Sequence, residues 1–271
     1  MRILENVRQR DVFLVQPMVS PVNTRLMELL IMIDAFKRAS AGRITAVVPY
    51  YAYGRSDKKD QPRVPITARL VANLIETAGA DRLLTVDLHA GQIQGFFNIP
   101  VDELTALYMI SRHFKDKELS DMVVVAADEG ASKRARNVGQ SVKAPLAIIE
   151  KRRVNNEEQV EVLNLIGEVR GRQAIMIDDE ILTGRTLVEG AAMLKEQGAT
   201  AVYAGVTHAI LSGRATEHIQ ESPIEELVVT DTIPLSPEKR VPKITVLSIA
   251  PLIGEAIKRI HTGHSVGELF Q

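Results

Sequence analysis

Short apolar runs alternate along almost the whole chain with stretches in which apolar residues recur every three to four positions. The first pattern is typical of strands and the second of helices. The expected strands are 11–17, 44–51, 83–88, 122–127, 146–150, 160–166, 174–177, 202–207, 226–230 and 245–249. The expected helices are 21–40, 66–77, 103–114, 186–196 and 251–261, with Gly42 closing the first and Gly79 the second.

This alternation predicts parallel sheets built from β-α-β units. The strand runs are apolar throughout, as expected of strands covered on both faces. A strand ends in acidic residues and a loop near Asp87 and His89, and again near Asp178 and Asp179. With 271 residues, the chain is long enough for two domains of about 130 residues. The sequence therefore predicts two α/β halves, divided near residues 100–105.

The composition excludes several classes of protein and of site. Lys and Arg total 33 and Asp and Glu total 34, so no overall field would attract nucleic acid or an anionic membrane. The absence of Cys excludes disulfides, thiolate metal sites and a catalytic thiol. No apolar run approaches the roughly 20 residues of a membrane helix, and residues 1–10 lack the apolar region of a secretory signal. We expect a soluble, cytoplasmic protein without a nucleic-acid or membrane partner.

The segment 174–188 carries the most informative chemistry. An apolar strand runs into adjacent carboxylates and then into a turn that opens a helix, and the candidate residues are Asp178, Asp179, Thr183, Gly184, Arg185 and Thr186. Carboxylates at the end of a parallel strand stand where open sheets bind ligands, and a helix N-terminus favours phosphate. Paired carboxylates suit the vicinal hydroxyls of a ribose, directly or through Mg²⁺. The same residues could also form an ordinary helix start with acidic residues in its first turn.

This pattern resembles the phosphoribosyl-binding motif of the phosphoribosyltransferase fold. A second segment contains Asp-Leu-His-Ala at 87–90, Gln-x-Gln-Gly-Phe-Phe at 92–97 and Pro-x-Asp at 100–102. Taken alone, a single His at this place is more often a hydrogen-bonded structural residue than a ligand. The whole stretch closely resembles the signature of the ribose-phosphate diphosphokinases (phosphoribosyl pyrophosphate synthetases), and the resemblance extends along essentially the whole chain.

Further segments carry the same resemblance. Residues 49–66 are similar to the family's nucleotide-binding loop, with Arg55, Ser56 and Asp57 where Arg-Gln-Asp is usual. Residues 127–134 match the segment that opens the first helix of the second domain, and its aspartate is Asp128. Residues 149–153 match the loop whose basic residues close over the transferring phosphates. A charge run alone is more often a solvated surface loop, and it is the resemblance that favours the functional interpretation.

The resemblance implies an α/β fold of two phosphoribosyltransferase-like domains, each a largely parallel sheet flanked by helices. The implied domains are 1–104 and 105–250, with a helix and tail over 251–271 that return to the first domain. The implied reaction moves the diphosphoryl group of ATP to the 1-hydroxyl of ribose 5-phosphate, giving 5-phospho-α-D-ribose 1-diphosphate and AMP. The chain has no Walker-type phosphate loop, which argues against a P-loop kinase.

Each candidate residue takes its role from the resemblance. Asp178 and Asp179 would hold the ribose hydroxyls, and residues 183–186 the 5-phosphate. Residues 55–57 would bind ATP, and His89 would bind both ATP and Mg²⁺. Asp128 would be a second Mg²⁺ ligand. Catalysis would rest on Lys151 and Arg153, whose cations would stabilise charge developing at the β-phosphate.

The resemblance also implies partners and departures. Inorganic phosphate and ADP are expected effectors, and a homohexamer is the expected assembly. The chain matches the family only from well inside its first domain, so about forty upstream residues, including a loop that reaches the adenine site of a neighbouring subunit, are expected to be missing. Arg185 stands where a small residue is common, and would add a cation or crowd the turn if a positive φ is required there.

Two alternatives to this enzyme remain. A non-catalytic homologue would associate with a full-length synthetase and regulate it, which the missing segment would favour and the retained His89, Asp128, Lys151 and Arg153 oppose. A phosphoribosyltransferase would share the ribose phosphate motif, but such an enzyme usually uses one domain.

Overall fold

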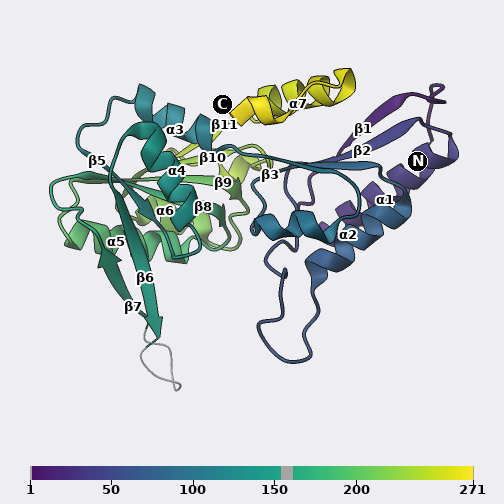
Figure 1. Cartoon of the computed structure of the whole chain (residues 1–271). Coiled ribbons are helices and arrows are strands. Elements are labelled where there is room, and N and C mark those ends of the chain that lie inside the picture. Colours follow the sequence, from purple (N-terminus) through teal and green to yellow (C-terminus); the bar gives the residue numbers. More distant parts are fainter. Residues whose placement is uncertain (1, 154–160, 271) are drawn as a thin grey trace. The chain divides into compact units, whose positions relative to one another are not determined.

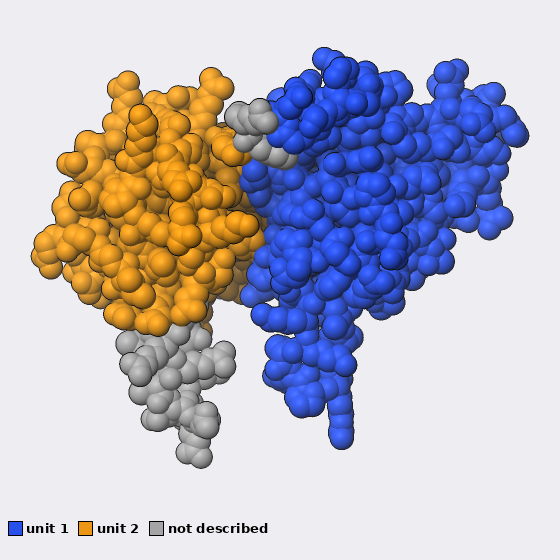
Figure 2. All heavy atoms as spheres, in the orientation of Figure 1, with its two compact units in different colours: residues 1–105, 249–271 blue, residues 106–248 orange. Residues whose placement is uncertain are grey.

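The computed structural model describes residues 2–153 and 161–270 (Figure 1). The chain forms two compact units (Figure 2): unit 1 comprises Met1–Thr105 and Ile249–Gln271, and unit 2 comprises Ala106–Ser248. Each unit is a largely parallel sheet flanked by helices, so the expected α/β fold class is confirmed.

Within the described residues, unit 1 contains a four-stranded sheet in the order β1-β2-β3-β4, with every pair parallel. The helices α1 and α2 pack their apolar faces against one side of this sheet, and α7 lies on its opposite side (Figure 1). The elements are β1 (Asp11–Val15), α1 (Val22–Arg38), β2 (Arg43–Val48), α2 (Thr67–Ala78), β3 (Arg82–Val86), the 3-10 helix η1 (Gly91–Phe96), β4 (Val101–Leu104), α7 (Ala250–Thr262) and η3 (Gly267–Phe270).

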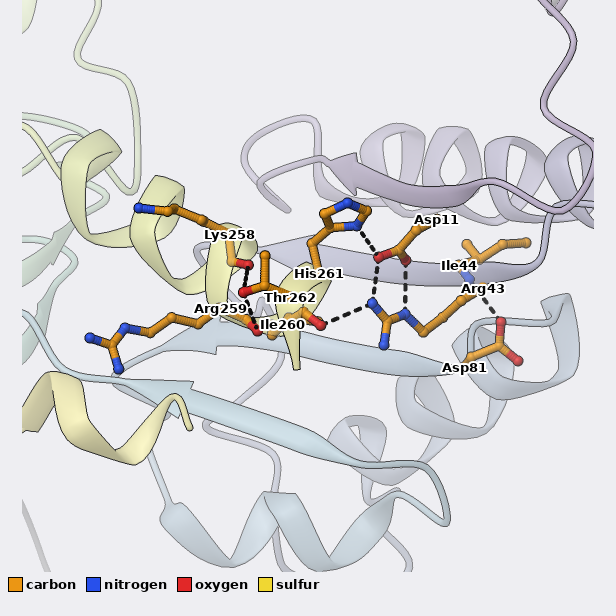
Figure 3. Close-up of polar contacts among 9 residues, drawn as sticks. All are labelled: Asp11, Arg43, Ile44, Asp81, Lys258, Arg259, Ile260, His261 and Thr262. Atoms are coloured by element: carbon orange, nitrogen blue, oxygen red, sulfur yellow. Dashed lines mark hydrogen bonds and ion pairs between the residues drawn. The ribbon is translucent and has the colours of Figure 1, made fainter. Parts of the chain in front are cut away.

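A polar cluster attaches α7 to the first two strands (Figure 3). Arg43 forms a two-pronged ion pair with Asp11, in which its Nε donates to Asp11 Oδ1 over 2.8 Å. The same guanidinium donates to the carbonyl of Ile260 in α7 over 3.0 Å, and His261 Nδ1 lies 2.8 Å from Asp11 Oδ2. The hydrogen bond from Arg43 is the main reason that the pKa of Asp11 lies below its usual value. Residues from both ends of the chain thus share one ion-pair cluster.

The described part of unit 2 contains a seven-stranded sheet in the order β11-β10-β9-β8-β5-β6-β7, parallel except for the β6–β7 pair. Helices α3 and α4 pack on one face, and α5 and α6 on the other. The elements are α3 (Leu107–Asp116), β5 (Met122–Ala126), α4 (Ser132–Val142), β6 (Leu146–Arg153), β7 (Glu161–Ile166), β8 (Gln173–Ile181), α5 (Arg185–Glu196), β9 (Ala201–Ala209), α6 (Ala215–Glu221), β10 (Ile224–Thr230), η2 (Pro237–Lys239) and β11 (Ile244–Leu247).

Strand β5 shows why the strand runs are apolar throughout. Val123 and Val125 pack in the core beneath α5 and α6, whereas Val124 and Ala126 pack in the core beneath α3 and α4. Both faces of the strand are therefore covered, as the sequence pattern predicts.

The strand order reverses at the centre of this sheet, which makes this point a topological switch point. Strands β5 and β8 are neighbours, but the chain continues from β5 to β6 on one side and from β8 to β9 on the other. In open α/β sheets, the carboxyl ends of two such strands border the crevice where ligands bind.

Three expectations about elements are wrong in part. The helix expected over 103–114 begins only at Leu107, because residues 101–104 pair with β3 as the strand β4. The strand expected over 174–177 extends to Ile181, because its backbone remains paired with β9. Helices α4 and α6 lie in segments where the apolar periodicity predicts no helix. Among the described residues, no helix is long and apolar enough to cross a membrane.

Candidate functional site

Three carboxylates gather where the pairing of β5 with β8 ends. Ala126 is the register partner of Ile177, so Asp178 directly follows this last paired position and Asp128 comes two residues after it, past the end of the neighbouring strand. The Asp179 N–H donates to Asp178 Oδ1 over 2.9 Å, and the Ala131 N–H at the start of α4 donates to Asp128 Oδ1 over 2.9 Å. The structure therefore brings together the aspartates that the sequence places about fifty residues apart.

Burial and mutual repulsion define the electrostatics of this cluster. Burial is the largest cause that raises the pKa of Asp178 well above its usual value, and the neighbouring Asp179 and Asp128 raise it further. Asp179 is 4% exposed, and the Arg134 guanidinium lies 3.5 Å from its Oδ2. A hydroxyl donor or a cation would therefore stabilise the ionised form of Asp178, whereas Asp179 already has a cationic neighbour.

The turn between β8 and α5 has the geometry of an anion-binding helix start. Gly184 precedes the first residue of α5 with φ of +74°. Arg185 begins the helix without a positive φ and forms an ion pair with Glu189 at 2.5 Å, so crowding at Arg185 is not imposed by the backbone. Thr183 is exposed and Thr186 is half-buried on either side of the turn. The first N–H groups of α5 and these hydroxyls are suited to bind a phosphate.

In unit 1, the loop after β2 lies against the loop after β3. A Cβ on Gly54 would lie 3.4 Å from the Cβ of His89, and Gln92 Nε2 donates to Asp57 Oδ2 over 3.0 Å. Arg55 and His89 are exposed, whereas Asp57 is buried. The structure therefore brings the expected ATP-binding residues of this unit into two adjoining loops.

Ser56 has a structural task in this pair of loops. Its hydroxyl accepts the Thr67 N–H over 3.2 Å, and its carbonyl accepts the Ala68 N–H over 3.1 Å. Both donors belong to the first turn of α2, whose own preceding residue supplies no side-chain cap. Ser56 therefore caps α2 from eleven positions before Thr67, within the loop that leads into the helix, a role that the sequence pattern does not suggest.

Glu103 on β4 holds the loop that carries His89. Its Oε1 accepts the Leu88 N–H over 2.9 Å, and its Oε2 accepts from Gln94 Nε2 over 2.5 Å. The carboxylate thus fixes the chain on both sides of His89. Sequence reasoning misses this residue because it assigns Glu103 to a helix.

A buried polar network lies at the carboxyl ends of β9 and β10. His208 Nδ1 lies 2.9 Å from Thr232 Oγ1, and the Thr230 hydroxyl donates to the Thr207 carbonyl over 2.7 Å. His208 is the register partner of Glu180 on β8, next to the aspartate cluster. The sequence gives no signal for this network beyond the position of His208 near the end of an apolar run.

Two expected groups of residues are not tested by this geometry. The backbones of Lys151 and Arg153 lie in β6 opposite Leu163 and Glu161, but their side chains lie outside the described part of the structure. The expected metal ligands His89 and Asp128 belong to different units. Among the described residues, no group of three or more His, Asp or Glu side chains could hold a metal ion.

Comparison with known proteins identifies the family. Residues 1–79 match the model of the N-terminal domain of ribose phosphate pyrophosphokinase, and residues 154–271 match that of the phosphoribosyl synthetase-associated domain. A ribose-phosphate pyrophosphokinase of Caldanaerobacter subterraneus subsp. tengcongensis is 56% identical over 270 residues, covering 99% of this chain and 85% of the relative. The chain belongs to the ribose-phosphate pyrophosphokinase family.

Other ribose-phosphate pyrophosphokinases support this membership. The protein of that name from Bacillus caldolyticus is 54% identical over 268 residues, covering 99% of this chain and 85% of the relative. The crystal structure of phosphoribosylpyrophosphate synthetase from Mycobacterium smegmatis superimposes with a TM-score of 0.91 at 43% identity, covering 97% of this chain and 86% of that one. The family is one of transferases in phosphoribosyl pyrophosphate synthesis, so the expected enzyme class is confirmed.

Proposed function

We propose that the chain transfers the diphosphoryl group of ATP to the 1-hydroxyl of ribose 5-phosphate. The hydroxyl oxygen bonds to the β-phosphorus of ATP, and the bond from that phosphorus to the oxygen shared with the α-phosphorus breaks. AMP leaves, and the hydroxyl proton passes to water. The observation that carries the proposal is the run from the adjacent carboxylates Asp178 and Asp179 into the Gly184 turn, at the switch point of the sheet.

This run fits a ligand that has vicinal hydroxyls at one end and a phosphate at the other. Asp178 and Asp179 are acceptors for the hydroxyls, and the raised pKa of Asp178 marks a carboxyl that a hydroxyl donor or a cation would stabilise as the anion. The first turn of α5, with Thr183 and Thr186, supplies donors for the phosphate. Ribose 5-phosphate has both features.

The proposed cofactor is Mg²⁺. The carboxylates of Asp128 and Asp178 repel one another and offer only oxygen, which suits a hard divalent cation. Mg²⁺ commonly uses one or two carboxylates together with waters and substrate phosphates, so a group of three protein ligands is not required. When bound, the ion would neutralise charge on the phosphates of ATP.

ATP is assigned to the adjoining loops of unit 1. Arg55 and His89 expose a guanidinium and an imidazole, while Ser56 and Asp57 hold the loops in place. Lys151 and Arg153 are proposed to stabilise the charge that develops during transfer. The homohexamer, the cytoplasmic location and the effectors phosphate and ADP stay predictions from the resemblance.

The test uses ATP labelled with ³²P at its γ-phosphate and measures which product carries the label. With ribose 5-phosphate and Mg²⁺, the purified chain should transfer the label to 5-phosphoribose 1-diphosphate and release an equal amount of AMP. Reactions without ribose 5-phosphate are the control for ATP hydrolysis. Release of ADP would refute diphosphoryl transfer. Binding of ribose 5-phosphate without release of AMP would support the non-catalytic alternative, which the matched relatives do not favour.

A further inference from the structure

Arg134 connects the two halves of the aspartate cluster. It lies on α4, and α4 begins where the Ala131 N–H donates to Asp128 Oδ1 over 2.9 Å. Its guanidinium then reaches across to β8, where Nη2 lies 3.5 Å from Asp179 Oδ2. The start of α4 and one of its side chains therefore contact the aspartate that follows β5 and one of the two aspartates of β8.

The pair between Arg134 and Asp179 is largely shielded from water. The Arg134 side chain is 18% exposed and that of Asp179 is 5% exposed. A carboxylate buried this deeply would be costly without a cationic partner, because burial removes the water that would otherwise solvate it. The guanidinium offsets that cost and gives the Asp179 carboxylate a fixed neighbour.

We propose that Arg134 is a positioning residue for ribose 5-phosphate, acting through Asp179. The guanidinium fixes the orientation of the Asp179 carboxylate, so that this carboxylate is placed to accept a ribose hydroxyl. The inference rests on the proposed function, because it concerns the same ribose site. A planar guanidinium suits this task, since it can face a carboxylate with two donors at once, which a lysine ammonium cannot do.

The decisive experiment is a double-mutant cycle of Arg134→Gln and Asp179→Asn, with ribose 5-phosphate binding measured by calorimetry. Each single variant should bind roughly tenfold more weakly or worse, whereas the double variant should bind within about twofold of Asp179→Asn alone. If Arg134→Gln weakens ribose 5-phosphate binding equally in the wild type and in Asp179→Asn, Arg134 contacts the ligand itself and the inference is overturned. Unchanged binding by Arg134→Gln would also overturn it.

Kinetics separate positioning from a general loss of structure. Arg134→Gln should raise KM for ribose 5-phosphate about tenfold while KM for ATP stays within about twofold. Arg134→Lys should recover less than half of the lost affinity, because charge alone does not orient the carboxylate. A matching rise of both KM values, or full recovery with Lys, would overturn the positioning role.

Thermal unfolding keeps the test independent of activity. Arg134→Gln should lower Tm, and adding Asp179→Asn should restore most of it, because the second change removes the carboxylate left without its cation. The control is Arg112→Gln, which breaks an exposed pair with Asp116 at 3.7 Å and should leave Tm and ribose binding unchanged.

The two failures can be told apart. If Asp179→Asn binds ribose 5-phosphate normally, the proposed ribose site is wrong and the positioning role falls with it, whatever the Tm cycle shows. If Asp179→Asn weakens binding but Arg134→Gln does not, the ribose site stands and the positioning role alone is wrong. Should Arg134→Gln not fold, the affinity of the double variant relative to Asp179→Asn decides the positioning role: a further loss beyond about twofold overturns it.

Discussion

Gly184 offers a direct test of the proposed phosphate turn. Its φ of +74° lies in the left-handed region, where alanine is disfavoured relative to glycine by about 1 kcal/mol. A Cβ added there would meet its nearest atoms, the Ala215 carbonyl oxygen and carbons of Ile181 and Ile219, at 3.6–3.7 Å. These are ordinary contact distances, so the cost of Gly184→Ala comes from the backbone and not from a clash.

The chain contains a matched control for this substitution. Gly171 has φ of +73°, and a Cβ added there would meet nothing within 4 Å. Gly171→Ala therefore carries the same backbone cost in the same unit, at the loop before β8 instead of the turn after it. Both variants should lose about 1 kcal/mol of stability, which corresponds to a fall in Tm of roughly 3 °C for a unit of this size.

The two variants should differ in ligand binding. Alanine at 184 favours a rotated peptide, which would turn a donor of the helix start away from the 5-phosphate. Loss of one charge-assisted hydrogen bond, about 1.5–3 kcal/mol, would weaken ribose 5-phosphate binding roughly ten- to hundredfold. Gly171→Ala should bind like the wild type.

The assay combines calorimetry for ribose 5-phosphate with unfolding followed by far-ultraviolet circular dichroism, because the chain has no Trp. Equal stability losses with unequal affinities would support the assignment of the turn. If Gly184→Ala retains wild-type affinity at the expected loss of stability, the phosphate does not bind at this helix start, and the reasoning fails.

Three further predictions concern other parts of the site. Burial raises the pKa of Asp178, so this carboxyl stabilises the fold while protonated and loses that contribution as pH rises through its folded-state pKa. Asp178→Asn should therefore have a higher Tm than the wild type at pH 8, and this difference in Tm should shrink as the pH falls toward the ordinary Asp pKa of 3.8. The same variant should bind ribose 5-phosphate more weakly. A pH profile of Tm identical to that of the wild type would contradict this reasoning. Ser56→Ala should cost about 1 kcal/mol by removing the acceptor for the Thr67 N–H, and a melting curve identical to the wild type would contradict the cap. Joint replacement of Lys151 and Arg153 by Ala should lower kcat about 10³-fold or more with both KM values within a few-fold, and steady-state turnover near the wild-type rate would show that these cations have no part in catalysis.

The fold could be predicted wherever burial leaves a periodic pattern. Strands β5 and β8 are runs of apolar residues because both of their faces are covered. The resemblance indicates the start of helix α4, but apolar periodicity does not, because only Ala135, Val138, Gly139 and Val142 are buried along a mostly polar sequence. The pattern there is too sparse for apolar periodicity to indicate a helix.

Long-range contacts set the limit of sequence reasoning. Gly42 is expected to end α1, but the chain already turns at Ser40, whose φ is +61°. A Cβ on Gly42 would lie 2.9 Å from the Gln9 backbone, so glycine is required there by a neighbour that no local pattern indicates.

In the candidate site too, local sequence features could be predicted and long-range contacts could not. The carboxylates of Asp178 and Asp179 could be found because they are adjacent to each other and to the turn. The pairing of Arg134 with Asp179 could not be found, because it depends on how α4 packs beside β8.

The attachment of α7 has a consequence for the order of events during synthesis. Asp11 and His261 are in contact although 250 positions separate them, so the cluster that joins α7 to β1 and β2 forms only after nearly the whole chain has been made. At about 5–20 residues per second, a ribosome needs tens of seconds to cover that interval. Unit 2, Ala106–Ser248, is continuous in sequence and can fold during this time, whereas the face of the first sheet that α7 covers must wait. Strand β1 therefore emerges long before α7 can cover its sheet, and this is the interval in which a chaperone would have most to protect.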